Sequence, residues 1–266
     1  MKTKIAALSL LISLLLTAPT DANAQRCGLV NTAFGPGERI EYNLSFSAGI
    51  LRTPAGRGTL TISEANLNGQ PVYRAEMVLG TTGAANLLFS FHETSVSYMD
   101  RSLRPLLHTR DTQERSHVVE RITFTYSGDQ VSVRSIRYIN DRQRHDEVLI
   151  SNECIFDNFS ILLFVRNLDY SQMNVGDRKR VQFVNGRRLT DMYVNFLGTS
   201  TLRIGRNRHE VINVSMTILD DAFTNPQEAI RASLSNDANR IPLEINMSLR
   251  VGSVRAVMNN VSGTRN

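Results

Sequence analysis

Two stretches of the chain, YMDRSLRPLLH at residues 98–108 and LSNDANRIPLEI at residues 234–245, follow the same plan. Each is an apolar run followed by Asp, a short polar turn, an Arg close to a Pro, and a second apolar run. Asp before a polar turn hydrogen-bonds to the turn backbone, and Pro presets the backbone where the next strand begins. We therefore interpret both stretches as turns between strands, with Leu103 and Ile241 pointing inward, and we expect no catalytic role for them.

The spacing around these two turns is repeated as well. In each copy a Gly followed by an acidic residue opens a strand, and the turn ends in Pro, at residues 37–105 and 176–242. Between these points LNGQPVYRAEMVL is echoed by IGRNRHEVINVSM. Repetition at one spacing indicates a duplicated unit. We predict two similar halves, about 37–105 and 176–242, within a single β-rich domain at 25–266.

Strand patterns dominate both halves. Apolar and polar residues alternate in RIEYNLSF from Arg39, YRAEMVL from Tyr73, EVINVSMTI from Glu210 and LEINMSL from Leu243. A period of two predicts antiparallel strands with one face on the core. Hairpin turns are indicated at Asn68-Gly69, Ser127-Gly128-Asp129 and Asn185-Gly186. The predicted fold is mainly β: a large curved antiparallel sheet, spiralled or barrel-like, from two similar halves with one central α-helix.

The helix is expected in FDNFSILLFVRNLD, residues 156–169. Asp157 is a suitable N-cap, and Phe159, Leu162, Leu163 and Arg166 follow at helical spacing. We predict a helix at about 157–168 that links the two halves and packs on the sheet.

The first 24 residues have the pattern of a secretory signal peptide. Lys2 and Lys4 precede an apolar run, and Ala22-Asn23-Ala24 supplies a cleavage site before Gln25. The apolar run is shorter than the roughly 20 residues that a membrane-spanning helix needs. We expect a periplasmic or secreted, soluble protein without a transmembrane segment. The formal net charge is +5, but an exported protein seldom meets nucleic acid, so we expect no nucleic-acid partner.

Cys27 and Cys154 are the two cysteines of the chain. In an oxidising compartment they could form a disulfide, and closing so long a loop stabilises by roughly 4 kcal/mol in the chain-entropy model. The alternative is that they are two unrelated small apolar residues, and both interpretations stay open at this point.

Three segments resemble a known family. NTAFGPGERIEYNLSF from Asn31, FDNFSILLFVRNLDYSQMNVGD from Phe156 and SNDANRIPLEINMSLRVGSVRA from Ser235 are similar to an exported bacterial, β-rich domain-of-unknown-function family of Gram-negative envelopes. The resemblance covers nearly the whole mature chain. It implies a curved or spiralled sheet similar in outline to periplasmic lipoprotein carriers, and it carries no functional residues.

Patterns that support catalysis or metal binding are weak. His108 and His117 could face each other across a hairpin, near Asp111 and Glu114, but solvated strand residues explain them equally well. His92 and Glu93 are adjacent on a strand and therefore point to opposite faces. Asp220-Asp221 fits a turn at a strand end. We expect no catalytic, cofactor-binding or metal-binding residues, no cofactor, and no enzymatic activity.

TTGAANLLFSF, residues 81–91, places Leu87, Leu88 and Phe89 beside a Gly bend. These residues are a candidate lip over a ligand cavity, and core packing at a sheet corner is the alternative. A curved sheet can enclose a ligand. We therefore expect an envelope protein that binds an apolar or lipid-like ligand. The alternative is a structural or interaction module that contacts envelope proteins or glycan. The oligomeric state is not predicted.

Overall fold

The computed structural model describes residues 27–218 and 228–266. The predicted signal peptide and Asp220-Asp221 lie outside the described residues. Eight strands follow one another in the first part of the chain: β1 (Arg39–Ala48), β2 (Leu51–Leu67), β3 (Gln70–Thr81), β4 (His92–Met99), β5 (Pro105–Gln113), β6 (His117–Ser127), β7 (Gln130–Ile139) and β8 (Arg142–Ser151).

A short helix, α1 (Gly83–Leu88), lies between β3 and β4. After β8 come β9 (Ile155–Phe156), helix α2 (Ser160–Arg166), the 3-10 turn η1 (Tyr170–Gln172), β10 (Arg178–Asn185), β11 (Arg188–Ile204), β12 (Asn207–Ile218), β13 (Ile230–Ser235), β14 (Pro242–Ser248) and β15 (Ser253–Ser262).

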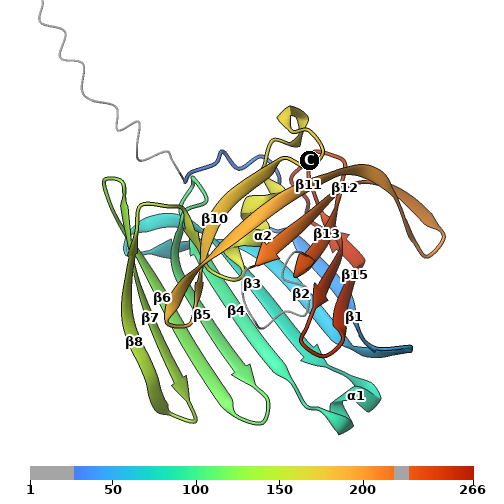
Figure 1. Ribbon diagram of the computed structural model, residues 1–266, viewed down its shortest axis with the longest axis horizontal. Helices are drawn as coiled ribbons and strands as arrows, with labels where there is room; N and C mark the ends of the chain where they lie inside the picture. The colour runs from blue at the N-terminus through green and yellow to red at the C-terminus, as the bar shows by residue number, and fades with distance from the viewer. Residues whose placement is uncertain (1–26, 219–227) are drawn as a thin grey trace, which may run out of the picture.

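These strands form one 15-stranded sheet. In spatial order, neighbouring strands follow from β8 down to β1; β1 pairs with β15, and the order then continues from β15 down to β9. The sheet curves until its two ends approach each other (Figure 1). At this seam the Ser151 hydroxyl on β8 donates to Gln182 Oε1 on β10 at 2.8 Å, and Arg187 lies 2.8 Å from Glu147. The predicted fold class is confirmed: a mainly β protein with a large, nearly closed sheet that is antiparallel except where β9 pairs with β10.

Strands β1 to β5 and strands β10 to β14 follow the same succession of antiparallel pairs. β2 and β11 each have 17 residues, and β3 and β12 each have 12. A register irregularity occurs at the same place in both, where Pro105 pairs with Met99 and Pro242 pairs with Leu234. Strand lengths and irregular registers thus correspond between β1 to β5 and β10 to β14, and the duplication of the two halves stays a prediction.

In both Asp turns the carboxylate accepts hydrogen bonds from backbone N–H groups of the turn, those of the second and fourth residues after Asp100 and of the second and third after Asp237. Asp100 Oδ1 accepts from the backbone N–H of Ser102 at 2.8 Å and of Arg104 at 3.0 Å. Asp237 Oδ1 accepts from the N–H of Asn239 at 2.9 Å and of Arg240 at 3.1 Å. Two residues before each Pro, the backbone takes a positive φ, 60° at Leu103 and 50° at Arg240. As expected, Leu103 and Ile241 are buried.

Helix α2 lies inside one end of the curved sheet (Figure 1) and is almost entirely buried. It is shorter than the predicted 157–168. It begins at Ser160, and its N-cap is Phe159, not the predicted Asp157. Asp157 lies before the turn that leads into the helix, where its Oδ1 accepts from the N–H of Phe159 at 2.9 Å and of Ser160 at 2.8 Å. At the C-terminal end of the helix, the Asn167 side chain donates to the Leu163 carbonyl. This hydrogen bond satisfies one of the last carbonyls, which have no partner within the helix.

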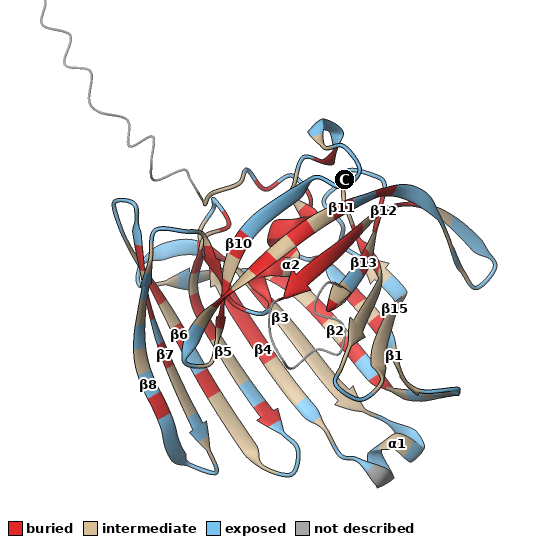
Figure 2. Ribbon diagram, viewed as in Figure 1, coloured by how far each residue is buried: buried red, intermediate tan, exposed pale blue. Residues whose placement is uncertain are grey.

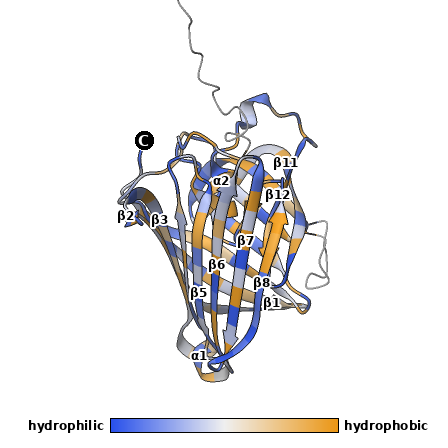
Figure 3. Cartoon of the chain, turned by 90° about the vertical axis from the view of Figure 1, so that its left-hand side faces the viewer, coloured by the Kyte–Doolittle hydropathy of each residue, from blue (hydrophilic) through white to orange (hydrophobic). Residues whose placement is uncertain are grey.

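Buried residues gather around α2, and exposure increases towards the opposite end of the sheet, where α1 lies (Figure 2). Phe159 and Leu163 pack with Ile40, Tyr42 and Leu60 in one of the core clusters. Along the strands, hydrophilic and hydrophobic residues alternate, as on β7 and β8 (Figure 3). None of the helices within residues 27–218 and 228–266 is long and apolar enough to cross a membrane.

Replacing Asp237 with Ala should destabilise the fold by about 1 kcal/mol, because the N–H groups of the turn lose their acceptor. Urea unfolding measures this loss. Asp129→Ala, in the two-residue turn between β6 and β7, is the control and should be close to neutral. If the two variants lose the same stability, the Asp side chain is not what holds the turn.

Candidate functional site

The concave face of the sheet is apolar over β13 to β15 and β1 to β3. The register aligns its inward-facing residues across neighbouring strands, with Leu44 opposite Ala256 and Phe46 opposite Val254. Beyond the part covered by α2, apolar residues of this face are half-buried: Leu44, Phe46, Met77, Leu79, Ile230, Ile245, Met247, Val254, Ala256 and Met258. The face therefore presents apolar surface that the protein's own core does not fully cover.

Strands β4 to β8 bring a polar row to the same face. Ser95 lies opposite Arg110, Arg110 opposite Glu120, Glu120 opposite Arg137, and Arg137 opposite His145. Arg110 forms a 3.0 Å ion pair with Glu120, which is 3% exposed. Burial, together with the nearby arginine charges, lowers the pKa of His145, so the neutral imidazole is favoured. The concave face is thus apolar on one side and charged on the other.

The polar side continues along β4 and β5. The Glu93 carboxylate accepts hydrogen bonds from Ser95 Oγ at 3.2 Å and from Thr112 Oγ1 at 2.8 Å. His92, its neighbour, is exposed on the opposite face, as its position in the strand predicts. The arrangement separates the two residues and gives no acid-base pair.

Ser97, His108 and Asp157 form a fully buried cluster where the sheet meets α2. The Ser97 hydroxyl donates to Asp157 Oδ1 at 2.7 Å, and His108 Nδ1 lies 3.0 Å from Ser97 Oγ and 3.2 Å from Asp157 Oδ1. In a catalytic triad the imidazole stands between Ser and Asp and uses both ring nitrogens. Here both partners contact Nδ1, and His108 Nε2 has no hydrogen-bond partner in the described part of the chain. The cluster anchors the start of α2.

Asp157 is ionised in this cluster. Burial by itself raises the pKa of its carboxyl, but the charge and hydrogen bond of His108, with hydrogen bonds from Ser97 and the Ser160 N–H, outweigh burial. The net result holds the pKa of Asp157 well below its usual range.

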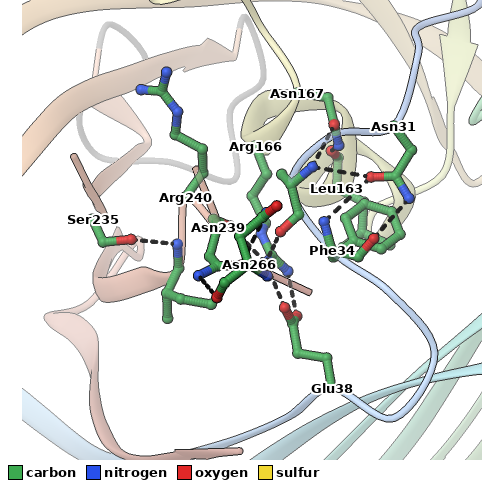
Figure 4. Close-up of polar contacts among 12 residues, drawn as sticks. Asn31, Phe34, Glu38, Leu163, Arg166, Asn167, Ser235, Asn239, Arg240 and Asn266 are labelled. Carbon is green, nitrogen blue, oxygen red and sulfur yellow. Dashed lines mark hydrogen bonds and ion pairs between the residues drawn. The ribbon is translucent and has the colours of Figure 1, made fainter. Parts of the chain in front are cut away.

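Arg166 and Glu38 form a second buried polar centre at the end of α2 (Figure 4). Both side chains are 0% exposed, and the guanidinium binds the carboxylate through two contacts of 2.6 and 2.8 Å. The same guanidinium donates to the carbonyls of Ala33 at 3.2 Å and Asn239 at 2.8 Å and lies over the Phe34 ring. One side chain therefore joins α2 to the segment before β1 and to the second Asp turn.

The N-terminal segment before β1 is held on α2 by further contacts. Cys27 and Cys154 form a disulfide, which resolves the two interpretations of these cysteines in favour of pairing. Asn167 Oδ1 accepts from the N–H of Thr32 at 2.8 Å and of Ala33 at 3.2 Å. Arg265, near the chain's last residue, donates to the Asn31 carbonyl at 2.6 Å. Both ends of the described chain therefore meet at α2.

A cavity of about 400 Å³ lies beside the disulfide. Leu29, Phe164, Leu168 and Met173 supply apolar walls, and Asp169, Asp177, Arg178 and Lys179 supply charges of both signs. This cavity is a second possible place for a small ligand.

The other sequence candidates lie apart. His117 Nε2 is 3.1 Å from Asp111 Oδ1 at the surface, whereas His108 is buried with Asp157 and does not face His117. Within the described residues, no group of three or more His, Cys, Asp or Glu side chains is placed to hold a metal ion. The segment with Leu87 and Phe89 forms α1 and its end, and both side chains are exposed; the side chain of Leu88 is not described.

Sequence reasoning missed the Ser97 to His108 pair, the polar row and the partner of Arg166. Alternation on β4 and β5 was a usable signal for the first two, because it puts Ser95, Ser97, His108 and Arg110 on one face. The pairing of Arg166 with Glu38 had no local signal.

Fold and site together define a barrel-like protein in which a curved, mostly antiparallel sheet surrounds the short helix α2. The chain belongs to DUF3108, a protein family of unknown function whose model matches residues 41–259. This match confirms the resemblance to a β-rich domain-of-unknown-function family. A search of curated proteins finds no match.

Two solved structures resemble the chain. A β-barrel-like protein of the domain of unknown function DUF1849 from Brucella abortus is 10% identical, with a TM-score of 0.58 over 87% of this chain and 98% of that one. A Bacteroides fragilis protein with a YmcC-like fold is 10% identical, with a TM-score of 0.38 over 89% of this chain and 100% of that one. The first similarity shows a shared fold.

Replacing Arg166 with Met should destabilise the protein by about 3–5 kcal/mol, because Glu38 is left as an unpaired buried carboxylate. Urea unfolding is the measurement, and adding Glu38→Gln should recover part of the loss. Arg180→Met, which breaks an exposed pair with Asp191, is the control and should have a much smaller effect. If both single variants lost the same free energy of unfolding, the buried pair would stabilise the fold no more than the exposed pair does.

Replacing Asp157 with Asn should change how stability depends on pH. Because the folded-state pKa is lowered, the carboxylate stabilises the fold above about pH 4, and that contribution is lost as pH falls. We expect the variant to be less stable at neutral pH and the difference to shrink in acid. Urea unfolding at a series of pH values tests this, with Glu64→Gln at an exposed carboxylate as control. A difference that does not change with pH contradicts the assignment.

Proposed function

We propose that the protein binds an amphiphilic, lipid-like molecule on the concave face of its sheet, outside the cytoplasm and without catalysing a reaction. The observation that carries this proposal is the half-buried apolar surface of β13 to β15 and β1 to β3. Apolar side chains that face inward but stay in contact with water are stabilised when a ligand removes them from water, by roughly 25 cal/mol per Å².

The polar row on β4 to β8 supports an amphiphile over a plain hydrocarbon. Arg110 and Arg137 face the concave side and are half-buried, and their Nε atoms have no hydrogen-bond partner within the described ranges. Guanidinium groups bind phosphate and carboxylate well in such surroundings. The apolar part of a ligand would lie against the β1 side and its polar group near the arginines.

A binding role without catalysis is supported by the state of the polar residues. The Ser97, His108 and Asp157 cluster is inaccessible, with each side chain at most 1% exposed. Its hydrogen bonds are also used to hold the helix start, so its groups have no substrate to act on.

Export is supported by two independent features. The first 24 residues have the signal-peptide pattern. The disulfide between Cys27 and Cys154 is of the kind that persists in oxidising compartments such as the periplasm. We therefore propose that the protein acts in the periplasm or outside the cell.

Replacing Ala256 with Trp should block binding, because the indole would cover the apolar surface between Leu44 and Ile245. The probe is 1-anilinonaphthalene-8-sulfonate, an anionic apolar dye, followed by fluorescence. We expect about tenfold weaker binding than in the unmodified protein. Mass spectrometry of the natively purified protein should also find bound lipid, less of it in the variant.

Two control variants locate the binding. Val257→Trp adds the same side chain to the outer face of the same strand and should leave binding unchanged. Met173→Trp fills the cavity beside the disulfide. Loss of dye binding in Met173→Trp but not in Ala256→Trp would contradict the proposal, as would a protein that binds neither dye nor lipid. The latter result would favour an interaction module.

A further inference from the structure

Three loops at one end of the molecule carry large apolar side chains in full contact with water. Ile50, in the turn between β1 and β2, is 108% exposed; Leu87 in α1 is 89% exposed; and Val251, in the turn before β15, is 72% exposed. Phe89, at the end of α1, is 43% exposed and stacks on Phe91. Single exposed apolar residues are ordinary, but their concentration at the loop tips of one end needs a cause.

The strand register places these loops next to one another. Ser47 pairs with Ser253, so the turn before β15 adjoins the turn between β1 and β2. Gly252 packs so closely on β1 that a Cβ there would lie 2.8 Å from the Phe46 ring. Helix α1 follows on the other side of β2, where the Thr82 N–H donates to the Ala55 carbonyl. Figures 1 and 3 place α1 at the end of the sheet opposite α2.

The charge of these loops has one sign. Residues 47–52, 81–92 and 248–253 contain Arg52 and Arg250 and no Asp or Glu. Both arginines are exposed. In a chain with 25 acidic residues, these three loops combine apolar tips with positive charge alone, whereas the β5–β6 and β7–β8 turns at the same end carry charges of both signs.

We propose that this end of the protein docks on the surface of an anionic lipid bilayer. Ile50, Leu87 and Val251 enter the interfacial layer, and Arg52 and Arg250 contact lipid phosphates. Interfacial binding needs apolar side chains at the depth of the acyl boundary and basic groups at the headgroups, and it does not need a continuous patch. A protein partner would instead be expected to bury a compact apolar centre, which three separate tips do not form.

Docking in this orientation points the open part of the concave face at the bilayer. Phe46 and Val254, which are half-buried on that face, lie next to the turns that would touch lipid. An amphiphile could then pass between bilayer and sheet with little exposure to water. The docking inference rests on the loops alone, so it can fail while ligand binding holds, and the reverse is also true.

The test is flotation of the full mature protein with vesicles of phosphatidylcholine, with and without phosphatidylglycerol. We expect the unmodified protein to float with the anionic vesicles. The triple variant Ile50→Ser, Leu87→Ser, Val251→Ser should bind at least about tenfold more weakly. Arg52→Ser with Arg250→Ser should lose about fivefold per arginine on anionic vesicles, and added salt should reduce this difference.

The control variant is Val30→Ser with Val175→Ser, two valines that are 82% and 72% exposed at the α2 end. It removes similar apolar surface from the other end and should bind vesicles like the unmodified protein. All substituted side chains are exposed, and circular dichroism melting verifies that the variants fold. The proposal is overturned if the unmodified protein does not float, if the triple variant floats equally well, or if the control loses as much. It is also overturned if the triple variant changes the oligomeric state without vesicles, since the tips would then bind protein.

Discussion

The buried ion pair between Arg166 and Glu38 is the contact on which the arrangement of the two halves depends. Removing two charges from water costs several kcal/mol per ion, and the cost is offset only when geometry and further hydrogen bonds are good. The contact is bidentate, and the guanidinium also reaches the carbonyls of Ala33 and Asn239, which leaves only its Nε without a hydrogen-bond partner among the described residues. These partners come from the N-terminal segment before β1 and from the second Asp turn. Moving α2 or any of them would leave a charge unpaired, so the pair fixes their relative positions.

The sequence was informative where structure is local. Alternation from Arg39 and Leu243 identified strands, and Asp237 with its polar turn identified a hydrogen-bonded corner, because both signals arise from a few neighbouring residues. Helix α2 was placed correctly but predicted too long, since its N-cap is Phe159 and Asp157 lies before the preceding turn. Long-range pairs were beyond such reasoning: Glu38 lies 128 residues from Arg166. Cys27 and Cys154 could be recognised as possible partners only because the chain has no other cysteines.

The candidate site was harder to predict than the fold. An inward-facing position can be buried by the protein or left for a ligand, and alternation does not distinguish the two cases. Ile40 and Leu44 follow the same pattern on β1, yet Ile40 is buried near α2 and Leu44 is half-buried. Helix α2 covers Ile40 and does not reach Leu44, and how far it covers the sheet depends on the folded chain. The segment with Leu87 and Phe89 was a candidate lip over a cavity, with core packing as the alternative; both side chains are exposed, and the role of the segment stays a prediction.

A single helix between two similar halves also explains why the molecule is asymmetric. Glu38 and Asp177 occupy corresponding places, because each follows a glycine with a positive φ, 98° at Gly37 and 97° at Gly176. Glu38 is buried against Arg166, whereas Asp177 is exposed and accepts from the Asn174 N–H at 2.8 Å. One arginine can pair fully with only one of the two acids. Asp177 instead lines the cavity beside the disulfide, together with Phe164 of α2, so the acid that Arg166 does not bind stays in contact with water.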